Sequence, residues 1–313
     1  MPRIAGRAVQ WHAMGRPLEL TSPDNPRVRQ VQRLVREHRH RRQTHLFVVE
    51  SVREMQRALE AGLALREVHV CPTVFRGEMG PLPDGVAVYH VTESLLRKMA
   101  YREKPEGLVA VFQQRTWQLS DLPLILQRAA TAKERPARSA EDRSLTRAAR
   151  QEELWLLAEG TAKPGNLGAM MRTAEAAGAW GVLLTEANVD IYNPNAIRAS
   201  TGAVFTLPAV CGDGEAIMEF LGKRNVKLLA STPQGGVPHT DVDMTGPVAV
   251  AIGAEDRGLD QRWLDAAARG GGLIHIPMFG RAVDSLNASV AAGIVLFEAV
   301  RQRLAQKRRQ RCD

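Results

Sequence analysis

NLGAMMRT, at residues 166–173, is the first of three segments that decide the fold of this chain. GAEDRGL follows at 253–259, and IPMFG at 276–280 leads into SLNAS at 285–289. Each segment is small, polar or glycine-rich and stands where an apolar strand should pass into a loop or a helix. Because open α/β sheets bind ligands beyond the carboxyl ends of their strands, we expect the three segments to contribute to one site.

Uninterrupted apolar runs surround these segments. They occupy residues 154–158, 182–184, 204–205, 226–230, 247–252 and 273–276. Continuous runs are typical of strands that are covered on both faces, so we predict a parallel sheet sandwiched by helices over residues 154–313. Its last helix should begin near Ser285 and carry Val290, Ile294 and Phe297 at helical spacing on its apolar face.

A smaller α/β unit is predicted over residues 22–113. Strands are expected at residues 46–50, 67–70, 86–89 and 108–112, alternating with helices. Residues 1–21 should form a tail. Between 114 and 153 the apolar pattern dissolves into Ala, Arg and Ser, which predicts a linker that is part helical and part disordered.

Basic residues dominate the first helical stretch, from Ser22 to His45. Arg29, Arg33 and Arg36 recur at helical spacing, opposite an apolar stripe. A solvated helix face is one interpretation of such a charge run. We favour a surface that contacts RNA phosphates, because Glu37 is the sole acid between Arg27 and Arg42.

Composition limits the class of protein. The chain has 313 residues and a formal net charge of +8, which favours a polyanionic partner over a surface that is basic only for solubility. The three cysteines are far apart, which argues for a reducing compartment. No apolar stretch reaches the roughly 18 residues of a membrane span, and no apolar run follows the first arginines. We therefore expect a cytoplasmic protein, with an organellar transit peptide as the alternative.

Several common sites are missing from the sequence. No G-x-G-x-x-G follows a strand and no P-loop is present, so a dinucleotide site is not supported. His38, His40 and His45 lie in the arginine run and are interpreted as basic surface, so no metal site is predicted. No Ser-His-Asp grouping can be drawn from the spacing either.

Asn166 and Arg172 are candidate site residues on a helix expected to end at Gly178. Asn is a preferred N-cap residue, so a cap is a complete structural explanation of Asn166. Arg172 lies among small apolar residues. A guanidinium in that setting needs a partner, either Glu175 three residues further on or a substrate phosphate.

Glu255 follows a buried strand, beside glycines that let the main chain approach a ligand closely. Its carboxylate could receive a cationic or hydroxyl group, or cap a helix that starts near Leu259. Ser285 suits an N-cap. Asn287, in the first helical turn, could reach either the backbone or a ligand.

Taken in this order, the three segments resemble the signature of the SpoU (TrmH-like) family of RNA ribose 2'-O-methyltransferases, in the SPOUT superfamily. The resemblance covers residues 154 to about 304. The N-terminal unit is more weakly similar to the α/β substrate-binding domain of many members. The resemblance implies a deep trefoil knot in the C-terminal sheet, S-adenosylmethionine held there by main-chain groups, and a homodimer with the active site at its interface.

The same resemblance implies roles for individual residues. Catalytic positions match Asn166, Arg172, Glu255, Ser285 and Asn287. Cofactor positions match Gly253, Ile276, Met278 and Leu286, and RNA contacts match Arg172 and Ser200. Asp256 is a departure, because many members carry a smaller, uncharged residue there.

The resemblance finally implies methyl transfer from S-adenosylmethionine to a ribose 2'-hydroxyl, without a metal. We expect 23S ribosomal RNA as the substrate, since simpler transfer-RNA members often lack a recognition domain. A transfer-RNA 2'-O-methyltransferase is the alternative enzyme. A non-catalytic RNA-binding or ribosome-assembly protein is the alternative outside the enzymes.

Overall fold

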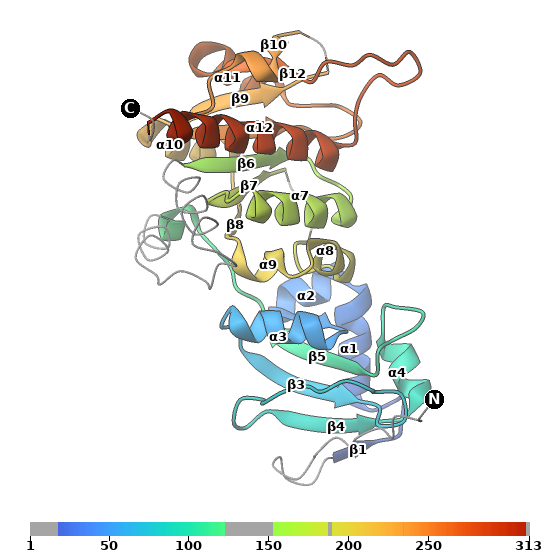
Figure 1. Ribbon diagram of the computed structural model, residues 1–313. Coiled ribbons are helices and arrows are strands. Elements are labelled where there is room, and N and C mark those ends of the chain that lie inside the picture. The colour runs from blue at the N-terminus through green and yellow to red at the C-terminus, as the bar shows by residue number, and fades with distance from the viewer. Residues whose placement is uncertain (1–17, 123–152, 187–189, 234, 311–313) are drawn as a thin grey trace, which may run out of the picture. The chain divides into compact units, whose positions relative to one another are not determined.

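The computed structural model describes residues 18–122, 153–186, 190–233 and 235–310. The chain divides into two compact units. Unit 1 comprises Met1–Arg115 and Tyr192–Phe205, and unit 2 comprises Thr116–Ile191 and Thr206–Asp313. Figure 1 labels the elements of both. The predicted tail up to residue 17 and the linker from 123 to 152 lie outside the described residues.

Unit 1 is built on a five-stranded mixed sheet. Its strand order is β1 (Leu18–Leu20), β4 (Ala87–Val91), β3 (Leu65–Val70), β5 (Leu108–Gln113) and β2 (Leu46–Val49). The first three strands run parallel, and β5 is antiparallel to both β3 and β2. The predicted strands are confirmed, whereas β1 was placed in the tail.

Helices of unit 1 bury the apolar stripe that the sequence shows. They are α1 (Pro26–Arg36), α2 (His38–Thr44), α3 (Val52–Glu60), α4 (Glu93–Met99), α8 (Pro194–Ser200) and α9 (Ala203–Thr206). Val28, Val31, Leu34 and Val35 of α1 are buried in the core cluster of this unit, as predicted. The stretch from Ser22 to His45 is two helices, because Glu37 adopts an extended conformation.

Unit 2 contains a seven-stranded sheet in which every pairing is parallel. The order is β10 (Val237–Pro238), β12 (Gly272–His275), β9 (Lys227–Ser231), β11 (Val248–Ile252), β6 (Leu154–Glu159), β7 (Gly181–Thr185) and β8 (Ala209–Cys211). The predicted parallel sheet is therefore confirmed. The run at 204–205 is wrong as a strand, because it lies in α9, and β8 and β10 were not predicted.

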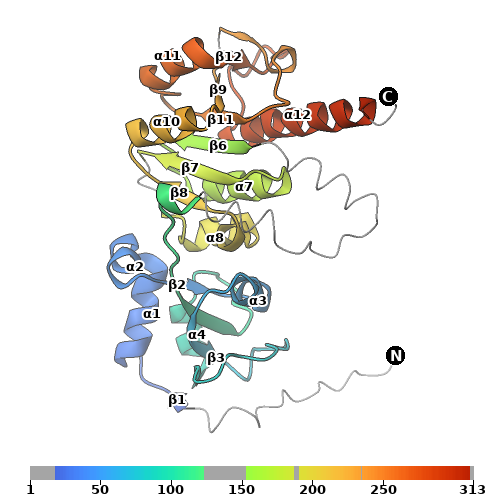
Figure 2. The same cartoon turned by 90° about the vertical axis from the view of Figure 1, so that its left-hand side faces the viewer.

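Helices cover both faces of this sheet. Figure 2 shows α10 (Gly214–Lys223) and α11 (Gln261–Gly270) on one face, and α7 (Pro164–Ala176) and α12 (Ala288–Arg309) on the other. Among its described residues, unit 2 also has two short 3₁₀ turns, η2 (Leu119–Asp121) and η3 (His239–Asp241). Trp155 of β6 and Trp263 of α11 are fully buried on the first face. Double coverage explains the uninterrupted apolar runs.

The last helix differs from its prediction. It begins at Ala288, with Asn287 as its N-cap, and not near Ser285. Its buried apolar residues include Ala292, Val295 and Leu296. Val290 and Phe297 remain 49% and 47% exposed, so they are not the core face. Among the described residues no helix, α12 included, has the length and apolar character needed to cross a bilayer.

Candidate functional site

Each of the three deciding segments follows the end of a strand of the unit 2 sheet, at the same edge of that sheet. α7 follows β6, the loop 253–260 follows β11, and the segment 276–287 follows β12. These strands belong to one block of parallel neighbours together with β9, so their carboxyl ends share an edge. Side chains from all three segments can therefore meet there.

Asn166 does not cap its helix. Lys163 is the N-cap of α7, without a capping side-chain bond, and Pro164 occupies the first turn. Asn166 lies inside that turn and is half-buried. Its side-chain amide donates to Glu255 Oε1, which is 89 residues away in sequence. The cap interpretation of Asn166 is therefore wrong, and its side chain is directed to another segment.

Glu255 is the centre of the assembly. Asn166 and Asn287 both donate to its Oε1, the latter at 3.2 Å, and Lys163 Nζ forms an ion pair with its Oε2. Asn287 Nδ2 also lies 3.3 Å from Asn166 Oδ1. We name Lys163, Asn166, Glu255 and Asn287 the Glu255 cluster. Three hydrogen-bonded or paired donors keep this carboxylate in one place.

A closed loop presents Glu255 to its partners. Ala254 and Gly258 exchange two backbone hydrogen bonds, at 3.0 and 2.9 Å, and form an isolated antiparallel bridge. A Cβ on Gly253 would lie 2.1 Å from the carbonyl carbon of Gly258, so only glycine fits there. Asp260 caps α11 by accepting from Arg262 N at 3.1 Å. Glu255 is thus not the helix cap.

Asn287 combines capping with site contacts. Its Oδ1 accepts from Ser289 N at 3.0 Å and from Ser289 Oγ at 2.6 Å. Since the oxygen faces α12, the Nδ2 donor is turned towards Glu255 and Asn166. The helix terminus therefore orients the amide.

Arg172 and Ser285 are outside this hydrogen-bonded cluster. Arg172 is exposed on α7, and in the described part of the chain it makes no hydrogen bond or ion pair. Of its two possible partners, Glu175 does not pair with it. Ser285 is exposed in the segment before α12. The structure brings together three of the five catalytic candidates and leaves Arg172 as an unpaired cation at the surface.

The candidate cofactor residues lie on main chain that is open to a ligand. Ile276 and Leu286 are half-buried and Met278 is exposed, in the segment that joins β12 to α12. Within the described residues, the N–H and C=O groups of residues 276–286 form no hydrogen bond to other protein groups. A ligand held by main-chain groups would find donors and acceptors here.

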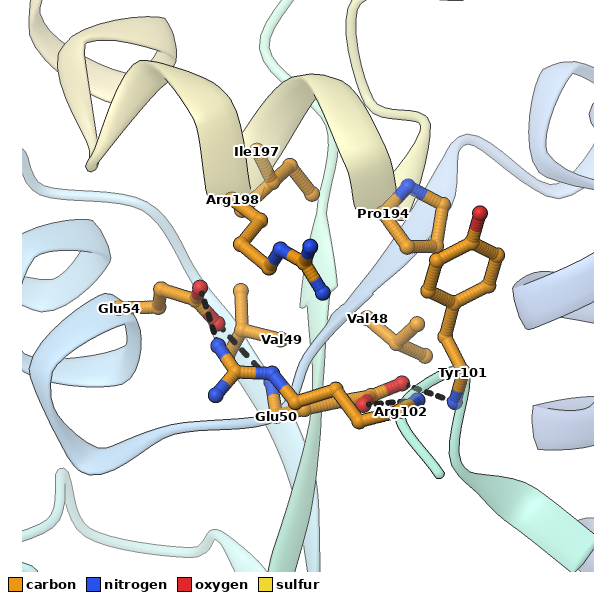
Figure 3. A pocket seen from close by; sticks show the side chains of 9 residues that line it. All are labelled: Val48, Val49, Glu50, Glu54, Tyr101, Arg102, Pro194, Ile197 and Arg198. Carbon is orange, nitrogen blue, oxygen red and sulfur yellow. Dashed lines mark hydrogen bonds and ion pairs between the residues drawn. The ribbon is translucent and has the colours of Figure 1, made fainter. Parts of the chain in front are cut away.

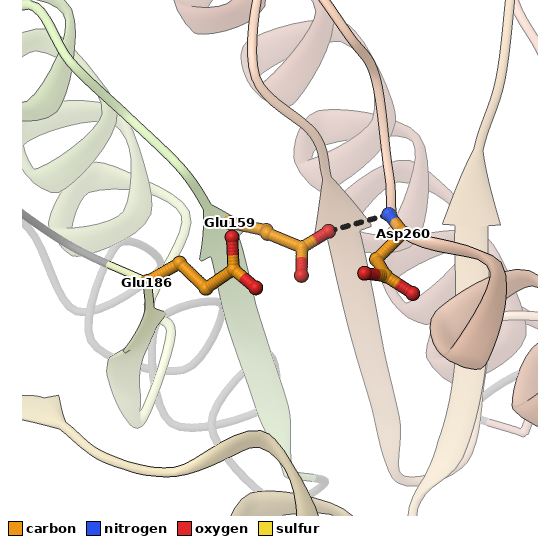
Figure 4. Close-up of side chains that lie close together, drawn as sticks. All are labelled: Glu159, Glu186 and Asp260. Carbon is orange, nitrogen blue, oxygen red and sulfur yellow. Dashed lines mark hydrogen bonds between the residues drawn. The ribbon is translucent and has the colours of Figure 1, made fainter.

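Acidic side chains also gather at this edge of the sheet (Figure 4). Carboxylate oxygens of Glu159, Glu186 and Asp260 lie within 4.8 Å of one another. Glu159 accepts from Asp260 N at 2.7 Å and from Arg262 Nη2 at 3.2 Å. Glu186 pairs with Arg262 at 3.0 Å and with Arg257 at 2.8 Å. Two arginines supply the opposing charge, so this group fastens the start of α11 to β6.

Comparison with known proteins identifies the family. Residues 153–297 match the SpoU rRNA Methylase family, and residues 25–110 match the MRM3-like substrate binding domain. The 23S rRNA (guanosine-2'-O-)-methyltransferase RlmB of Pectobacterium atrosepticum is 32% identical over 223 residues, 70% of this chain and 80% of that protein. The chain belongs to the SpoU rRNA methylase family.

Other proteins that are similar to this chain are also named as methyltransferases. The 23S rRNA (uridine(2479)-2'-O)-methyltransferase of Streptomyces viridochromogenes is 36% identical over 163 residues, and the match spans half of this chain and 55% of that protein. A crystal structure of an RNA 2'-O ribose methyltransferase superposes with a TM-score of 0.72 at 35% identity, covering 92% of this chain and all of the other. AviRb of S. viridochromogenes, in complex with AdoMet, gives 0.70 at 27% identity, over 90% of this chain and 99% of that one.

The arginines predicted to contact RNA are exposed on α1 of this family member. Arg29 pairs with Asp24 at 2.5 Å and Arg33 with Glu37 at 3.1 Å. Exposed pairs of this kind are weak, so both guanidiniums can exchange an acid for a phosphate. Arg36 has no ion pair with a described residue. Arg41, counted as part of the charge run, is instead buried and donates to the carbonyls of Leu34 and Val35.

Ser200 is placed differently from its expected role. It is fully buried, its hydroxyl donates to Ile197 O at 2.8 Å, and it accepts from Gly202 N at 3.2 Å. Those bonds close the carboxyl end of α8, where Thr201 is left-handed. A direct contact with RNA would require an exposed hydroxyl, so burial argues against the contact predicted for Ser200.

Lys163 was not predicted as a site residue, although its position in the sequence indicates a special role. It directly precedes Pro164, and proline is common at the first helical position. That placement makes Lys163 the N-cap, where a cation opposes the helix dipole and supplies no capping acceptor. An unfavourable residue at a helix start indicates a second role, and its pair with Glu255 provides one.

Proposed function

We propose that this protein transfers a methyl group from S-adenosylmethionine to a ribose 2'-hydroxyl of 23S ribosomal RNA. The observation that carries the proposal is the Glu255 cluster, which joins three segments at the carboxyl edge of the sheet in a chain of the SpoU family. Its relatives from P. atrosepticum and S. viridochromogenes are named as 23S rRNA 2'-O-methyltransferases.

The residues present fit the cofactor. The main chain of 276–286 has donors and acceptors that no described protein group satisfies, beside the closed glycine loop of 253–258. We assign Gly253, Ile276, Met278 and Leu286 to hold S-adenosylmethionine, as the resemblance implies. When bound, the cofactor supplies an electrophilic methyl group on a sulfonium.

Arg172 is assigned to the RNA backbone. A guanidinium stays protonated under ordinary conditions, so it does not act as a base. Exposed and without an acid partner among the described residues, it can grip the phosphate beside the reacting ribose through two parallel N–H donors. Its positive charge also favours the ionised form of the 2'-hydroxyl and lowers the pKa of that hydroxyl.

The Glu255 cluster is assigned to orienting the ribose. A carboxylate fixed by two amides and an ammonium can accept a hydrogen bond from the hydroxyl without reorganising. Positioning of this kind supplies a large part of the acceleration of an in-line transfer. Ser285, exposed within the segment that would hold the cofactor, is assigned to the same face.

We also propose a cytoplasmic homodimer with a deep trefoil knot in unit 2, as the resemblance implies. Val290 and Phe297 stand seven residues apart on α12, so they share a face, and each is about half exposed. An apolar stripe that its own unit leaves uncovered supports burial against a second copy of the chain.

The test combines binding and RNA mapping. Calorimetry with S-adenosylmethionine should show one site per chain, and purified protein should methylate 23S ribosomal RNA in vitro. Ribose-methylation mapping of total RNA, from cells with and without the protein, should reveal one lost 2'-O-methyl group in 23S RNA. If the lost 2'-O-methyl group is in transfer RNA instead, the substrate is transfer RNA. Absence of cofactor binding would favour a non-catalytic assembly factor.

A further inference from the structure

A polar pocket lies within unit 1 and shares no residue with the Glu255 cluster (Figure 3). Its walls come from the end of β2, from α3, from the turn after α4 and from α8. The polar side chains that line it include Glu50, Glu54, Tyr101, Arg102 and Arg198. Val48 and Val49 form an apolar floor. No role in the reaction proposed above requires it.

Buried carboxylates make the wall of this pocket rigid. Glu50 is buried and accepts from the backbone N–H groups of Tyr101 and Arg102, the latter at 3.0 Å. Burial raises the pKa of the Glu50 carboxyl. Arg102 pairs with Glu54 at 3.0 Å and with Glu106 at 2.6 Å. Arg102 is therefore already engaged by two carboxylates.

Arg198 is the exception. Figure 3 shows its side chain reaching from α8 into the pocket, towards the wall that carries Arg102. It is exposed and forms no ion pair with a described residue, since the nearby carboxylates already serve other donors. Ser200 fixes the end of the helix that carries it. A guanidinium that projects into a pocket and forms no ion pair with a described residue can receive a phosphate through two N–H donors.

Tyr101 places an aromatic ring beside this seat. The residue is 44% exposed, and its hydroxyl accepts from Asn195 Nδ2 at 2.7 Å, so the ring is tethered to α8. Aromatic rings that stay accessible are the usual platforms on which proteins stack unpaired bases. Phosphate and base recognition are thus combined in one small pocket.

We propose that this pocket binds one unpaired nucleotide of the RNA substrate, with its phosphate on Arg198 and its base against Tyr101. The proposal rests on the proposed function, because it assumes that the natural ligand is RNA. It assigns unit 1 a site for a single-stranded nucleotide, separate from the basic face of α1. A nucleotide held here would make the protein favour RNA that carries an unpaired residue.

The test uses full-length protein and two defined probes, a single-stranded oligouridylate and an RNA duplex of the same length. Arg198→Gln should weaken oligouridylate binding about tenfold and reduce the slope of log K against log salt by about 0.7, the loss of one phosphate contact. Tyr101→Ala should weaken oligouridylate binding about tenfold, with little effect on the duplex. Tyr101→Phe, which keeps the ring, should retain most of the affinity.

Arg97→Gln is the matched control, because it removes one exposed, paired arginine of unit 1 outside the pocket. Equal losses for Arg97→Gln and Arg198→Gln would overturn the pocket, since they would reflect net charge alone. Unchanged oligouridylate affinity in Arg198→Gln, with the wild-type melting temperature, would overturn it as well. The pocket and the reaction can fail separately. If the wild type methylates ribosomal RNA and Arg198→Gln has the same KM for that RNA, only the pocket is rejected. A wild type that binds oligouridylate through Arg198 but methylates nothing rejects only the reaction.

Discussion

Asn287 donates through its side-chain amide to the Glu255 carboxylate at 3.2 Å, while its carbonyl oxygen caps α12. One side chain therefore serves both the stability of a 22-residue helix and the geometry of the candidate site. The two functions can be separated, because capping needs only a short acceptor whereas the site needs the amide.

Asn287→Ser should keep the cap and lose the site. Serine is as good an N-cap as asparagine, so the free energy of unfolding should change little, but its short hydroxyl cannot supply the amide donor to Glu255. Asn287→Ala should lose both, at about 1 kcal/mol of stability. Methyl transfer should fall about ten- to a hundredfold in both variants. Urea unfolding and single-turnover methylation measure the two effects, and an active Asn287→Ser would remove Asn287 from the site.

Lys163→Ser should stabilise the fold and lower the rate of methyl transfer. Serine is a favourable N-cap for α7, and the substitution removes a cation from the positive end of the helix, so the free energy of unfolding should rise by about 0.5–1 kcal/mol. Loss of the ion pair with Glu255 should lower kcat at least severalfold. In a Glu255→Gln background the effect of Lys163→Ser on kcat should vanish. Additive losses in kcat would mean that Lys163 acts independently of Glu255.

Arg172→Lys tests the phosphate grip. Lysine preserves the charge but not the planar pair of donors, so kcat/KM for RNA should fall about a hundredfold while the affinity for S-adenosylmethionine stays unchanged. Arg97→Lys, at an exposed arginine of α4 that pairs with Glu93, is the control and should change kcat/KM little. Retained activity with a nearly unchanged pH profile in Arg172→Lys would reject the bidentate contact.

Phe297→Glu tests the homodimer. A charge at one of the two exposed apolar residues of α12 should raise the dimer dissociation constant about 30-fold or more, if these residues are buried between two copies. Sedimentation velocity over a range of concentrations measures this shift. Leu18→Glu, at an exposed apolar residue of unit 1, should leave it unchanged. A Phe297→Glu protein that sediments as the wild type would place the interface elsewhere.

Burial explains why most of the unit 2 sheet was predictable. β6, β9 and β11 lie in the interior of the sheet and carry helices on both faces, so their sequences are continuous apolar runs. β8 and β10 have three and two residues, too few for any pattern. Val204 and Phe205 were wrongly assigned to a strand. Such a short apolar run fits a buried helix equally well.

The candidate site was predictable in its residues but not in its bonds. Asn166 and Ser285 were both interpreted as caps from residue preference alone, yet Lys163 and Asn287 occupy those positions. Pro164, in the first turn of α7, marks where the helix begins. The pairing of Lys163 with Glu255 spans 92 residues, and no local pattern in one sequence encodes a contact of that range.

Glu298 links stability to acid pH. It is buried on α12, and hydrogen bonds from Arg301 at 2.7 and 2.8 Å, with one from Gln302, lower the pKa of its carboxyl below the ordinary 4.5. A carboxyl whose pKa is lower in the folded state stabilises the fold above its unfolded pKa, and this contribution is lost as the pH falls through the folded pKa. Glu298→Gln should therefore cost about 1–3 kcal/mol at pH 7, and less at each step below pH 4.5.

Urea midpoints of wild type and Glu298→Gln, measured between pH 3 and 7, give the two curves, which should converge on the acid side. Glu78→Gln is the control, because Glu78 is exposed and has no ion pair with a described residue. Its curve should follow the wild type throughout. A constant gap between wild type and Glu298→Gln would mean that packing of the side chain, and not its ionisation, stabilises α12 against η3.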